Sequence, residues 1–339
     1  MRQVVLDSPR SLKLRQVPPP LPLAGEVLVE VKATAICGTD LHIYSGHSPT
    51  TYPRVVGHEA AGVVREVGSG VDAFSSGDRV MINPILGCNS CDWCILGQDN
   101  LCPHAGLMGR DSDGVLREFL TIPQAYVFAL PPHLSFAEGA LVQPLSTVVH
   151  AQVRTNIKST ESVVVLGLGA TGLMHVQVSK LAGAYPIIAV GRSQWKLELA
   201  EQMGADLLVY AGQEEPVAQV LRLTGGHGAD VTIETVGTPD TMHQSIKMTK
   251  PGGRVMAFGI SSQPLDSLDL YRMYLNEMTL IFSRATTRTD FQRTVALVAS
   301  ERVALKPLLT REYSMEDAAL AFQFAEEQQS QVLRVLINP

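Results

Sequence analysis

The stretch Val163–Gly172, VVVLGLGATG, joins four apolar residues directly to a G-x-G-x-x-G sequence. The apolar run predicts a buried strand, and a helix is expected to follow it from Gly172 to Leu181. Glycines in this context permit a tight turn and let a pyrophosphate approach the helix N-terminus, although a glycine-rich turn without a ligand is the alternative. We therefore expect a dinucleotide to bind at Gly167, Gly169, Ala170, Thr171 and Gly172.

Strands and helices alternate on the C-terminal side of this loop. This rhythm predicts βαβ units, and hence an α/β domain with a doubly wound parallel sheet and helices on both faces. The expected strands are Ser162–Leu166, Pro186–Val190, Leu207–Tyr210, Asp230–Glu234 and Gly253–Phe258. The expected helices after the first are Gln194–Met203, Glu215–Leu223, Thr238–Met248 and, beyond residue 285, Asp290–Ser300 and Met315–Phe324.

The first 150 residues follow another pattern, in which short β-branched runs alternate with Gly, Pro and Asp. Val27–Val31, Ala61–Val67 and Asp78–Ile82 are examples. Many short strands with irregular loops predict a β-rich barrel or sandwich-like unit. A β-like stretch around Leu308 and a last strand, Val332–Ile337, are expected near the C-terminus.

Composition excludes several classes of protein. The 339 residues include 27 Lys plus Arg and 33 Asp plus Glu, for a net charge of −6, and 45% are hydrophobic. This content supports large cores and excludes a mainly disordered chain, while the acidic balance disfavours binding to nucleic acid or anionic membranes. No signal peptide and no apolar run of about 18 residues is recognisable, so we expect no membrane span and a cytoplasmic protein with reduced thiols.

The end of the second expected strand bears on the choice of nicotinamide cofactor. An NAD site usually places Asp or Glu about 20 residues after the glycine loop, to bind the ribose 2′-hydroxyl. This chain has Gly191 there, followed by Arg192 and Ser193, which could donate to a 2′-phosphate. The sequence therefore favours NADP(H) over NAD(H), although Arg192 could instead be a solvated cation or stack on adenine.

Four of the five cysteines lie within 15 residues, in the pattern C-x2-C-x2-C-x7-C. Four thiolates can complete a tetrahedral zinc shell and leave no position for substrate, which predicts a structural site. An iron–sulfur cluster uses the same ligands and stays an alternative, whereas a nucleic-acid finger would need a basic recognition helix. The expected ligands are Cys88, Cys91, Cys94 and Cys102.

The fifth cysteine, Cys37, begins the sequence Cys-Gly-Thr-Asp-Leu-His, and Gly57-His58-Glu59 follows about twenty residues later. Cys, His and Glu are all zinc ligands, and three protein ligands with an open position define a catalytic site. Taken alone, Cys37 would more simply be a buried thiol and His42 an ordinary polar residue.

Taken together, these motifs make the chain resemble the zinc-dependent medium-chain alcohol dehydrogenases, nearest to the polyol (sorbitol) and threonine dehydrogenase branch. The similarity extends over essentially the whole length and includes two further motifs, Gly77–Val80 and Lys250–Arg254. It implies a GroES-like catalytic domain at residues 1–148, a Rossmann cofactor domain at 149–285 and a segment at 286–339 that returns to the catalytic domain. It also implies a homodimer or homotetramer.

The resemblance also implies roles for individual residues. Cys37, His58 and Glu59 match the catalytic zinc ligands, so two zinc ions per chain are expected. Thr39 matches the hydroxyl that takes the alcohol proton, His42 the relay to solvent, and Asp40 the carboxylate that orients the zinc-bound histidine.

Gln143 stands where this branch usually has glutamate, at or near a fourth metal position. We expect it to be a weak ligand or to bind the metal's water, and its neutral amide to leave the zinc a stronger Lewis acid. The rival interpretation is a site that binds zinc poorly.

The expected reaction is alcohol–ketone interconversion, with hydride passing between a secondary alcohol, such as a sugar alcohol or diol, and NADP(H). The tyrosine of the Arg-Tyr pair of polyol relatives is missing near Ser283-Arg284, while the Cys37–Tyr44 stretch is closer to the threonine branch. An NAD-dependent threonine or polyol dehydrogenase is therefore an alternative. Two hypotheses of different classes are a zinc-free enzyme similar to quinone reductases and a non-catalytic cofactor-binding protein with a weakened site at Gln143.

Overall fold

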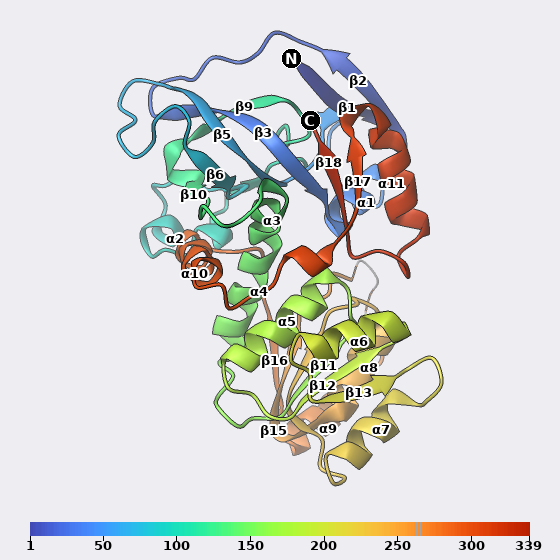
Figure 1. Ribbon diagram of the computed structural model, residues 1–339. Helices are drawn as coiled ribbons and strands as arrows, with labels where there is room; N and C mark the ends of the chain where they lie inside the picture. Colours follow the sequence, from blue (N-terminus) through green and yellow to red (C-terminus); the bar gives the residue numbers. More distant parts are fainter. Residues whose placement is uncertain (262–263, 265) are drawn as a thin grey trace. The chain divides into compact units, whose positions relative to one another are not determined.

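The computed structural model describes residues 1–261, 264 and 266–339. It consists of unit 1, residues 1–146 and 285–339, and unit 2, residues 147–284 (Figure 1). Helix α4, Val142–Thr155, starts in unit 1 and ends in unit 2. The expected α/β fold class, with one β-rich unit and one doubly wound parallel sheet, is confirmed.

Unit 2 is built on a parallel sheet in the order β13-β12-β11-β14-β15-β16. Its central strand β11, Val163–Leu166, is buried along its whole length, as the unbroken apolar run predicted. The strand order runs outward in both directions from the pair β11 and β14, which makes this pair the topological switch point of the sheet. The other strands are β12 (Ile187–Gly191), β13 (Leu207–Tyr210), β14 (Ala229–Glu234), β15 (Thr249–Ala257) and β16 (Thr279–Phe282).

The crossover helices of unit 2 pack on this sheet, α5 against α6 and α7 against α8. They are α5 (Ala170–Leu181), α6 (Gln194–Gln202), α7 (Pro216–Leu223) and α8 (Pro239–Met248). Sequence analysis missed α9, Leu270–Leu275, and the edge strand β16. They have only 6 and 4 residues, too few for apolar periodicity to distinguish a helix from a strand or a loop.

Unit 1 contains a sheet in the order β10-β6-β5-β3-β18-β17, with β9 also paired to β3. The C-terminal strand β18 lies between β3 and β17, so the last residues of the chain complete a sheet that begins near the N-terminus (Figure 1). The strands are β3 (Glu26–Ile36), β5 (Glu59–Val67), β6 (Arg79–Ile82), β9 (Phe119–Pro123), β10 (Val127–Ala129), β17 (Leu309–Ser314) and β18 (Arg334–Asn338).

Smaller elements surround this sheet. A second sheet pairs β1 (Arg2–Ser8) with β2 (Ser11–Gln16) and β4 (Arg54–Val55), and a short ladder joins β7 (Ile85–Leu86) to β8 (Gly106–Leu107). The helices are α1 (Gly38–Tyr44), α2 (Asp92–Ile95), α3 (Phe136–Ala140), α10 (Arg288–Ala299) and α11 (Ala318–Glu327). Met315–Asp317 forms a 3-10 turn, so the last expected helix begins three residues later than the sequence suggested.

Side chains from distant parts of the chain form the core of unit 1. One cluster joins Leu6, Ile43 and Phe322, from β1, α1 and α11. Another joins Val29 and Leu120, from β3 and β9. Burying these side chains holds the C-terminal segment against the N-terminal sheet, at about 25 cal/mol per Å² of apolar surface removed from water.

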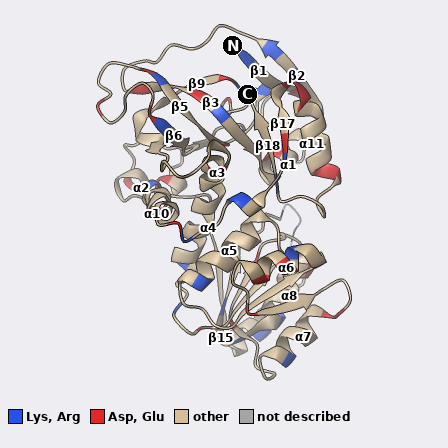
Figure 2. Ribbon diagram, viewed as in Figure 1, with Lys and Arg blue, Asp and Glu red and all other residues tan. Residues whose placement is uncertain are grey.

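Charged residues are distributed over both units, with Lys and Arg interspersed among Asp and Glu (Figure 2). This distribution differs from the one-sided basic surface typical of proteins that bind nucleic acid. In the described part of the chain, no helix combines the length and the hydropathy needed to cross a membrane.

Candidate active site and cofactor site

Neighbouring strands of unit 1 bring three functional side chains together. In the antiparallel pair β3–β5, Ala35 lies opposite Glu59, so Cys37, just after β3, comes close to the start of β5. On the other side of β3, Val335 of β18 lies opposite Ile36. This register places Arg334 beside Cys37, although the two residues are 297 positions apart in sequence.

Cys37, His58 and Glu59 form a compact group of potential metal ligands. Each offers one ligand atom, and these atoms all lie within 4.8 Å of one another. His58 and Glu59 are buried, while Cys37 is partly exposed, so the thiol is the most exposed of the three side chains. Gly57 turns the chain into His58 with φ of +93°, a conformation that glycine adopts without strain.

Asp40 connects the group of Cys37, His58 and Glu59 to helix α1 through hydrogen bonds. Cys37 is the N-cap of α1, and its backbone N–H donates to Asp40 Oδ2 at 2.9 Å. The other carboxylate oxygen, Oδ1, lies 3.0 Å from His58 Nδ1. One fully buried side chain therefore fixes both the start of the helix and the orientation of the imidazole, leaving His58 Nε2 available as a ligand.

The two remaining residues expected to be catalytic also lie on α1. Thr39 is half-buried in the first turn of the helix, and His42 is exposed near its end. Their spacing of three residues places them on neighbouring positions of one helix face. The path from Thr39 to His42 therefore runs from partly buried surface toward solvent.

Arg334 is a candidate site residue that sequence reasoning missed. Its Nη2 donates to Glu59 Oε1 at 3.2 Å and lies 4.0 Å from Cys37 Sγ. Only 8% of Arg334 is exposed, so this guanidinium is a buried positive charge beside two potential anionic ligands. No local motif marks it, because its partners lie on other strands.

In this site, burial and neighbouring charges shift the pKa values of the side chains in opposite directions. Burial alone would lower the pKa of His58, but Asp40 and Cys37 outweigh it, and the pKa lies well above the ordinary 6.5. Burial raises the pKa of Glu59 above its ordinary value, although Arg334 and His58 oppose the rise. For Arg334, burial lowers the pKa, and the negative groups Glu59, Cys37 and Asp40 raise it further than burial lowers it.

The donor set fits a zinc ion. Sulfur, imidazole nitrogen and carboxylate oxygen are the ligand types that zinc binds in proteins, and three of them leave a coordination position open. Glu59 Oε2 is buried without a hydrogen-bond partner among the described residues, which is an expensive state unless a cation binds there. Gln143 is buried in the first turn of α4, with its backbone carbonyl accepting from Ser146 Oγ at 2.6 Å.

The four remaining cysteines form a second group, the four-cysteine lobe, residues 88–102. Their Sγ atoms all lie within 4.8 Å of one another, close to the separation of about 3.8 Å that a tetrahedral shell of zinc–sulfur bonds requires. Backbone N–H groups of Cys88 and His104 donate to Cys102 Sγ at 3.5 and 3.3 Å. Such bonds stabilise thiolates, so the lobe is suited to hold a structural metal.

The thiols of this lobe differ in acidity. Hydrogen bonding from Ser90 lowers the pKa of Cys88 to about 5, whereas burial raises the pKa of Cys94 to about 12. Without a cation, the buried Cys94 would therefore keep its proton at neutral pH. A bound metal supplies the positive charge that favours the thiolate there.

Residues outside the cysteine pattern anchor the lobe to unit 1. Asp99 Oδ1 accepts from the backbone N–H of Arg288 at 3.1 Å, and the Arg288 guanidinium lies over the ring of Tyr126 at 5.6 Å. The Tyr126 hydroxyl donates to Gly87 O at 2.8 Å and lies 3.1 Å from Asn89 Oδ1. The lobe is thus attached to the first turn of α10 and to the core of the sheet.

In unit 2, a different structural feature accounts for each glycine of the glycine loop. Gly167 adopts φ of +100°, and a Cβ on Gly172 would stand 2.0 Å from Gly167 O. A Cβ on Gly169 would meet no described atom within 4 Å beyond its chain neighbours, so space remains in front of the loop. Gly169 is the N-cap of α5 and has no side chain to cap the first-turn N–H groups, which stay available for a phosphate.

The end of β12 differs from a site for a ribose-binding carboxylate. A Cβ on Gly191 would stand 2.7 Å from Leu168 Cδ1, so a larger side chain would have to displace that buried leucine. Arg192 is exposed, and Ser193 is the N-cap of α6. Lys196, which sequence analysis missed, is buried one turn later, and burial lowers its pKa to about 8.

Comparison with known proteins gives a consistent result. Residues 23–132 match the family described as "Alcohol dehydrogenase GroES-like domain", and residues 170–300 match "Zinc-binding dehydrogenase". The chain is 32% identical to a sorbitol dehydrogenase of Bacillus subtilis, over 100% of this chain and 97% of that protein. It is also 32% identical to an L-threonine 3-dehydrogenase of Symbiobacterium thermophilum, covering 96% of this chain and 94% of the relative.

The comparison with solved structures is consistent with the comparison with sequence relatives. The alcohol dehydrogenase TADH from Thermus sp. ATN1 superimposes with a TM-score of 0.92 at 30% identity, covering 100% of this chain and 99% of the other.

Proposed function

Because the chain belongs to the zinc-dependent medium-chain alcohol dehydrogenases, in the polyol and threonine dehydrogenase branch, we propose that it interconverts a secondary alcohol and its ketone with NADP(H). It is an NAD(P)-dependent alcohol oxidoreductase. The observation that carries the proposal is the group of Cys37, His58 and Glu59 beside Asp40 and Arg334.

In this proposal the two units have different functions. Unit 1 is the catalytic domain, completed by the C-terminal segment, and unit 2 binds the cofactor. The expected boundaries, 1–148, 149–285 and 286–339, lie within two residues of the unit boundaries. This division is supported by the location in unit 1 of both clusters of potential metal ligands found among the described residues, and of the glycine loop in unit 2.

The residues of unit 1 have the following roles. Cys37, His58 and Glu59 hold a zinc ion, and Asp40 and Arg334 orient His58 and Glu59. When bound, zinc supplies a Lewis acid for the alcohol oxygen, and the nicotinamide supplies the hydride acceptor. Thr39 accepts the alcohol proton, and His42, exposed on the same helix, passes it to solvent.

The neutral side chain of Gln143 determines the net charge of this site in the proposal. The thiolate of Cys37 and the carboxylates of Asp40 and Glu59 together balance a divalent cation and the guanidinium of Arg334. A neutral amide at residue 143 keeps that balance, whereas a glutamate would add a buried negative charge. In this proposal Gln143 lies at the fourth metal position, as a weak ligand or as the hydrogen-bond partner of water there.

A second zinc ion, held by the four-cysteine lobe, completes the metal content. Its role is structural, since four thiolates leave no open coordination position. Thiolate sites of this kind require a reducing environment, which supports a cytoplasmic protein.

The residues at the end of β12 support a preference for NADP(H) over NAD(H). Gly191 lacks the carboxylate that would select NAD, and a larger side chain there would have to displace Leu168, while Arg192 and Ser193 supply donors suited to a 2′-phosphate. The buried amine of Lys196 adds positive charge one turn further on. Gly167, Gly169, Ala170, Thr171 and Gly172 hold the pyrophosphate in this proposal.

An NAD-dependent polyol or threonine dehydrogenase is the second candidate. The names of the relatives, sorbitol and L-threonine dehydrogenases, favour substrates with neighbouring oxygen or nitrogen groups. The deciding experiment is a panel of sugar alcohols, diols and amino alcohols, each assayed with NADP⁺ and NAD⁺. Turnover of a diol or sugar alcohol with higher kcat/KM for NADP⁺ supports the main proposal, and a clear preference for NAD⁺ contradicts it. Turnover that survives full zinc removal contradicts zinc dependence.

We also propose that the chain is a homodimer or homotetramer joined through β16. This strand is an edge of the unit 2 sheet, with exposed Phe282 on it and exposed Tyr271 and Tyr274 on nearby α9. Two copies of one edge strand can pair antiparallel around a two-fold axis. Sedimentation equilibrium on wild type and Phe282→Lys tests this, and a monomeric wild type would contradict it.

A further inference from the structure

A buried carboxylate lies at the switch point of the unit 2 sheet and has no role in the mechanism above. Glu234 ends β14 and pairs in register with Leu166, the last residue of β11 before the glycine loop. Its side chain is fully buried. Ligands of open α/β sheets bind at the carboxyl ends of the strands beside the switch point, so the position of Glu234 is functionally significant.

Glu234 fixes two turns at this edge of the sheet. Its Oε1 accepts from the backbone N–H groups of Val236 at 2.8 Å and Gly237 at 2.9 Å. Its backbone carbonyl accepts from Phe258 N and Gly259 N, both at 2.9 Å. The carboxylate therefore holds the turn that follows β14, residues 235–237, while the backbone carbonyl of the same residue holds the turn that follows β15, residues 258–260.

Glycines permit close packing between these turns. A Cβ on Gly259 would stand 2.7 Å from Glu234 Oε2 and 2.3 Å from Gly237 N. A Cβ on Gly237 would stand 2.6 Å from the carbonyl oxygen of Ile260. The carboxylate and the two turns thus form one packed unit, in which moving one part moves the others.

This unit is in direct contact with the glycine loop. The Thr235 hydroxyl lies 2.9 Å from Gly167 O, to which it donates. A Cβ on Gly167 would stand 2.6 Å from both Thr235 Oγ1 and Val236 Cγ2. The residues whose backbone Glu234 holds therefore determine where the first glycine of the loop lies.

The surface that the two turns expose is apolar. Val236 is 43% exposed and Ile260 is 76% exposed, although both follow buried strands. Exposed aliphatic side chains beside a phosphate loop match the apolar ring faces of a dinucleotide. Glu234 itself is too deeply buried to touch such a ligand.

Glu234 Oε2 has no hydrogen-bond donor in the part of the chain that the structure describes. A buried carboxylate oxygen without a donor destabilises the fold, so stability alone does not explain why a charged side chain occupies this place. Such destabilised polar groups are typical of functional sites.

We propose that Glu234 is a positioning residue for the dinucleotide: its carboxylate holds the 235–237 turn, on which the 258–260 turn packs, against the glycine loop without touching the cofactor. The proposal rests on the proposed cofactor role of the glycine loop. It assigns Glu234 to binding geometry and not to hydride or proton transfer.

The test compares Glu234→Ala and Glu234→Gln with Asp230→Asn, a change at the opposite end of the same strand. Fluorescence titration gives the Kd of NADPH and NADH, and kcat is measured at saturating cofactor. We expect Glu234→Ala to raise the Kd about tenfold, equivalent to about 1.4 kcal/mol, with kcat changed less than about twofold. Glu234→Gln keeps an acceptor oxygen for Val236 and Gly237, so its Kd should stay within about threefold of wild type.

Asp230→Asn should lower the melting temperature and leave the Kd unchanged, because Asp230 contacts Ser162 and Lys250 and not the two turns. If Glu234→Ala does not fold, Glu234→Asp replaces it, since withdrawing the carboxylate by one methylene should also raise the Kd. Wild-type Kd in the Ala or Asp variant overturns the proposal, as does a Gln variant as weak as the Ala variant. Wild type that binds neither cofactor contradicts the proposed function and the role of Glu234 with it.

Discussion

At the scale of single residues, buried charges dominate the candidate active site. Asp40, Glu59 and Arg334 are all at least nine-tenths buried and lie around one thiol and one imidazole. Charges in such an environment interact strongly, because little water screens them. Residue 143 is therefore expected to affect metal affinity and reactivity through its charge as much as through its shape.

We predict that Gln143→Glu raises the zinc affinity and moves the pH optimum of alcohol oxidation upward by about one unit. The added negative charge attracts the cation but weakens it as a Lewis acid, so the alcohol loses its proton less readily. Chelator competition measures the affinity, and a pH–rate profile measures the optimum. Unchanged zinc content together with an unchanged profile would contradict the role assigned to Gln143.

Arg192 offers a separate test of cofactor choice. We predict that Arg192→Ala raises the KM for NADP⁺ about tenfold or more and changes the KM for NAD⁺ less than about twofold. The reason is the loss of charge-assisted hydrogen bonds to the 2′-phosphate, each worth about 1.5–3 kcal/mol. Arg222→Ala, which removes an exposed arginine from α7, is the matched control. Equal effects of Arg192→Ala on both cofactors would show that Arg192 does not select between them.

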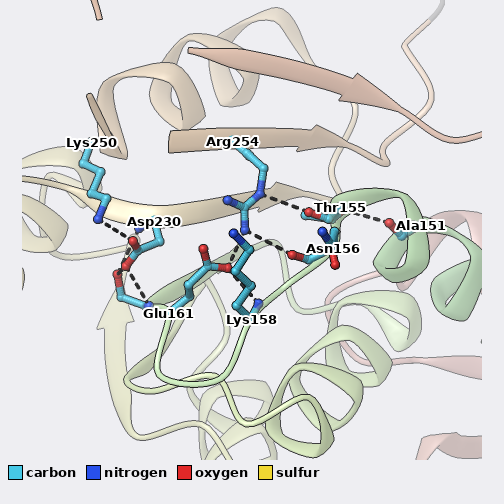
Figure 3. A network of polar contacts seen from close by, with 9 residues as sticks. Ala151, Thr155, Asn156, Lys158, Glu161, Asp230, Lys250 and Arg254 are labelled. Atoms are coloured by element: carbon cyan, nitrogen blue, oxygen red, sulfur yellow. Dashed lines mark hydrogen bonds and ion pairs between the residues drawn. The ribbon is translucent and has the colours of Figure 1, made fainter. Parts of the chain in front are cut away.

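At the scale of secondary-structure elements, a polar network joins the starts of β11, β14 and β15 to the end of α4 (Figure 3). The Arg254 guanidinium donates to Thr155 O at 3.0 Å and forms an ion pair with Glu161. These bonds satisfy carbonyl oxygens that the last turn of a helix leaves without partners. The network lies near the amino ends of these strands, whereas the glycine loop follows the carboxyl end of β11. We therefore interpret the role of the network as structural.

Acid should weaken this network. Burial raises the pKa of Glu161, but Arg254 and the Lys158 N–H lower it further, so the net pKa lies below the ordinary 4.5. A carboxyl group with a depressed pKa stabilises the fold above its unfolded pKa and loses that contribution as the pH falls through the folded pKa. The stability from Glu161 is therefore complete at pH 7 and is lost as the pH falls from the ordinary 4.5 through the lower folded pKa.

We predict that Arg254→Met lowers the free energy of unfolding by about 1–3 kcal/mol at pH 7. Its unfolding free energy should also fall less steeply than that of wild type between pH 7 and pH 3.5. Urea titrations at the two pH values measure both effects. Lys247→Met removes an exposed positive charge from α8 and should stay within about 0.5 kcal/mol of wild type. A parallel pH dependence of the Arg254 variant and wild type would exclude Glu161 as the acid-sensitive group.

At the scale of the whole molecule, two groups of potential metal ligands lie in unit 1, and we propose different purposes for them. The group around Cys37 has three ligands and a partly exposed thiol, whereas the four-cysteine lobe supplies a complete set. Asp99 attaches the lobe to Arg288, in the segment where the chain re-enters unit 1 after unit 2. Loss of the lobe metal should therefore affect the stability of that segment.

We predict about two zinc ions per wild-type chain, and about one in both Cys37→Ser and Cys94→Ser. Cys37→Ser should be inactive with a nearly unchanged melting temperature, because the backbone N–H of residue 37 still donates to Asp40 at the start of α1. Cys94→Ser should melt at a lower temperature and show faster amide exchange around Arg288. Metal analysis with thermal unfolding separates the two sites. Equal loss of stability in both variants would contradict separate catalytic and structural roles.

The sequence by itself determined the features whose residues are close together along the chain. The glycine loop, the four-cysteine pattern and the alternation of strands and helices in unit 2 each depend on short-range spacing, which sterics and ligand geometry convert directly into structure. The resemblance to a dehydrogenase family extended these predictions to Cys37, His58, Glu59 and the fold class. The short elements α9 and β16 were missed, because segments of 6 and 4 residues are too short for periodicity to identify.

Only the tertiary structure decided which distant residues share a site. Arg334 reaches Glu59 because β18 pairs with β3, and Glu234 reaches the glycine loop because β14 pairs with β11. Strand register sets these contacts, and register depends on the packing of the whole sheet and not on any local pattern. The physical reason is that burial and charge compensation are properties of three-dimensional neighbours, which can be separated by nearly the whole length of the chain.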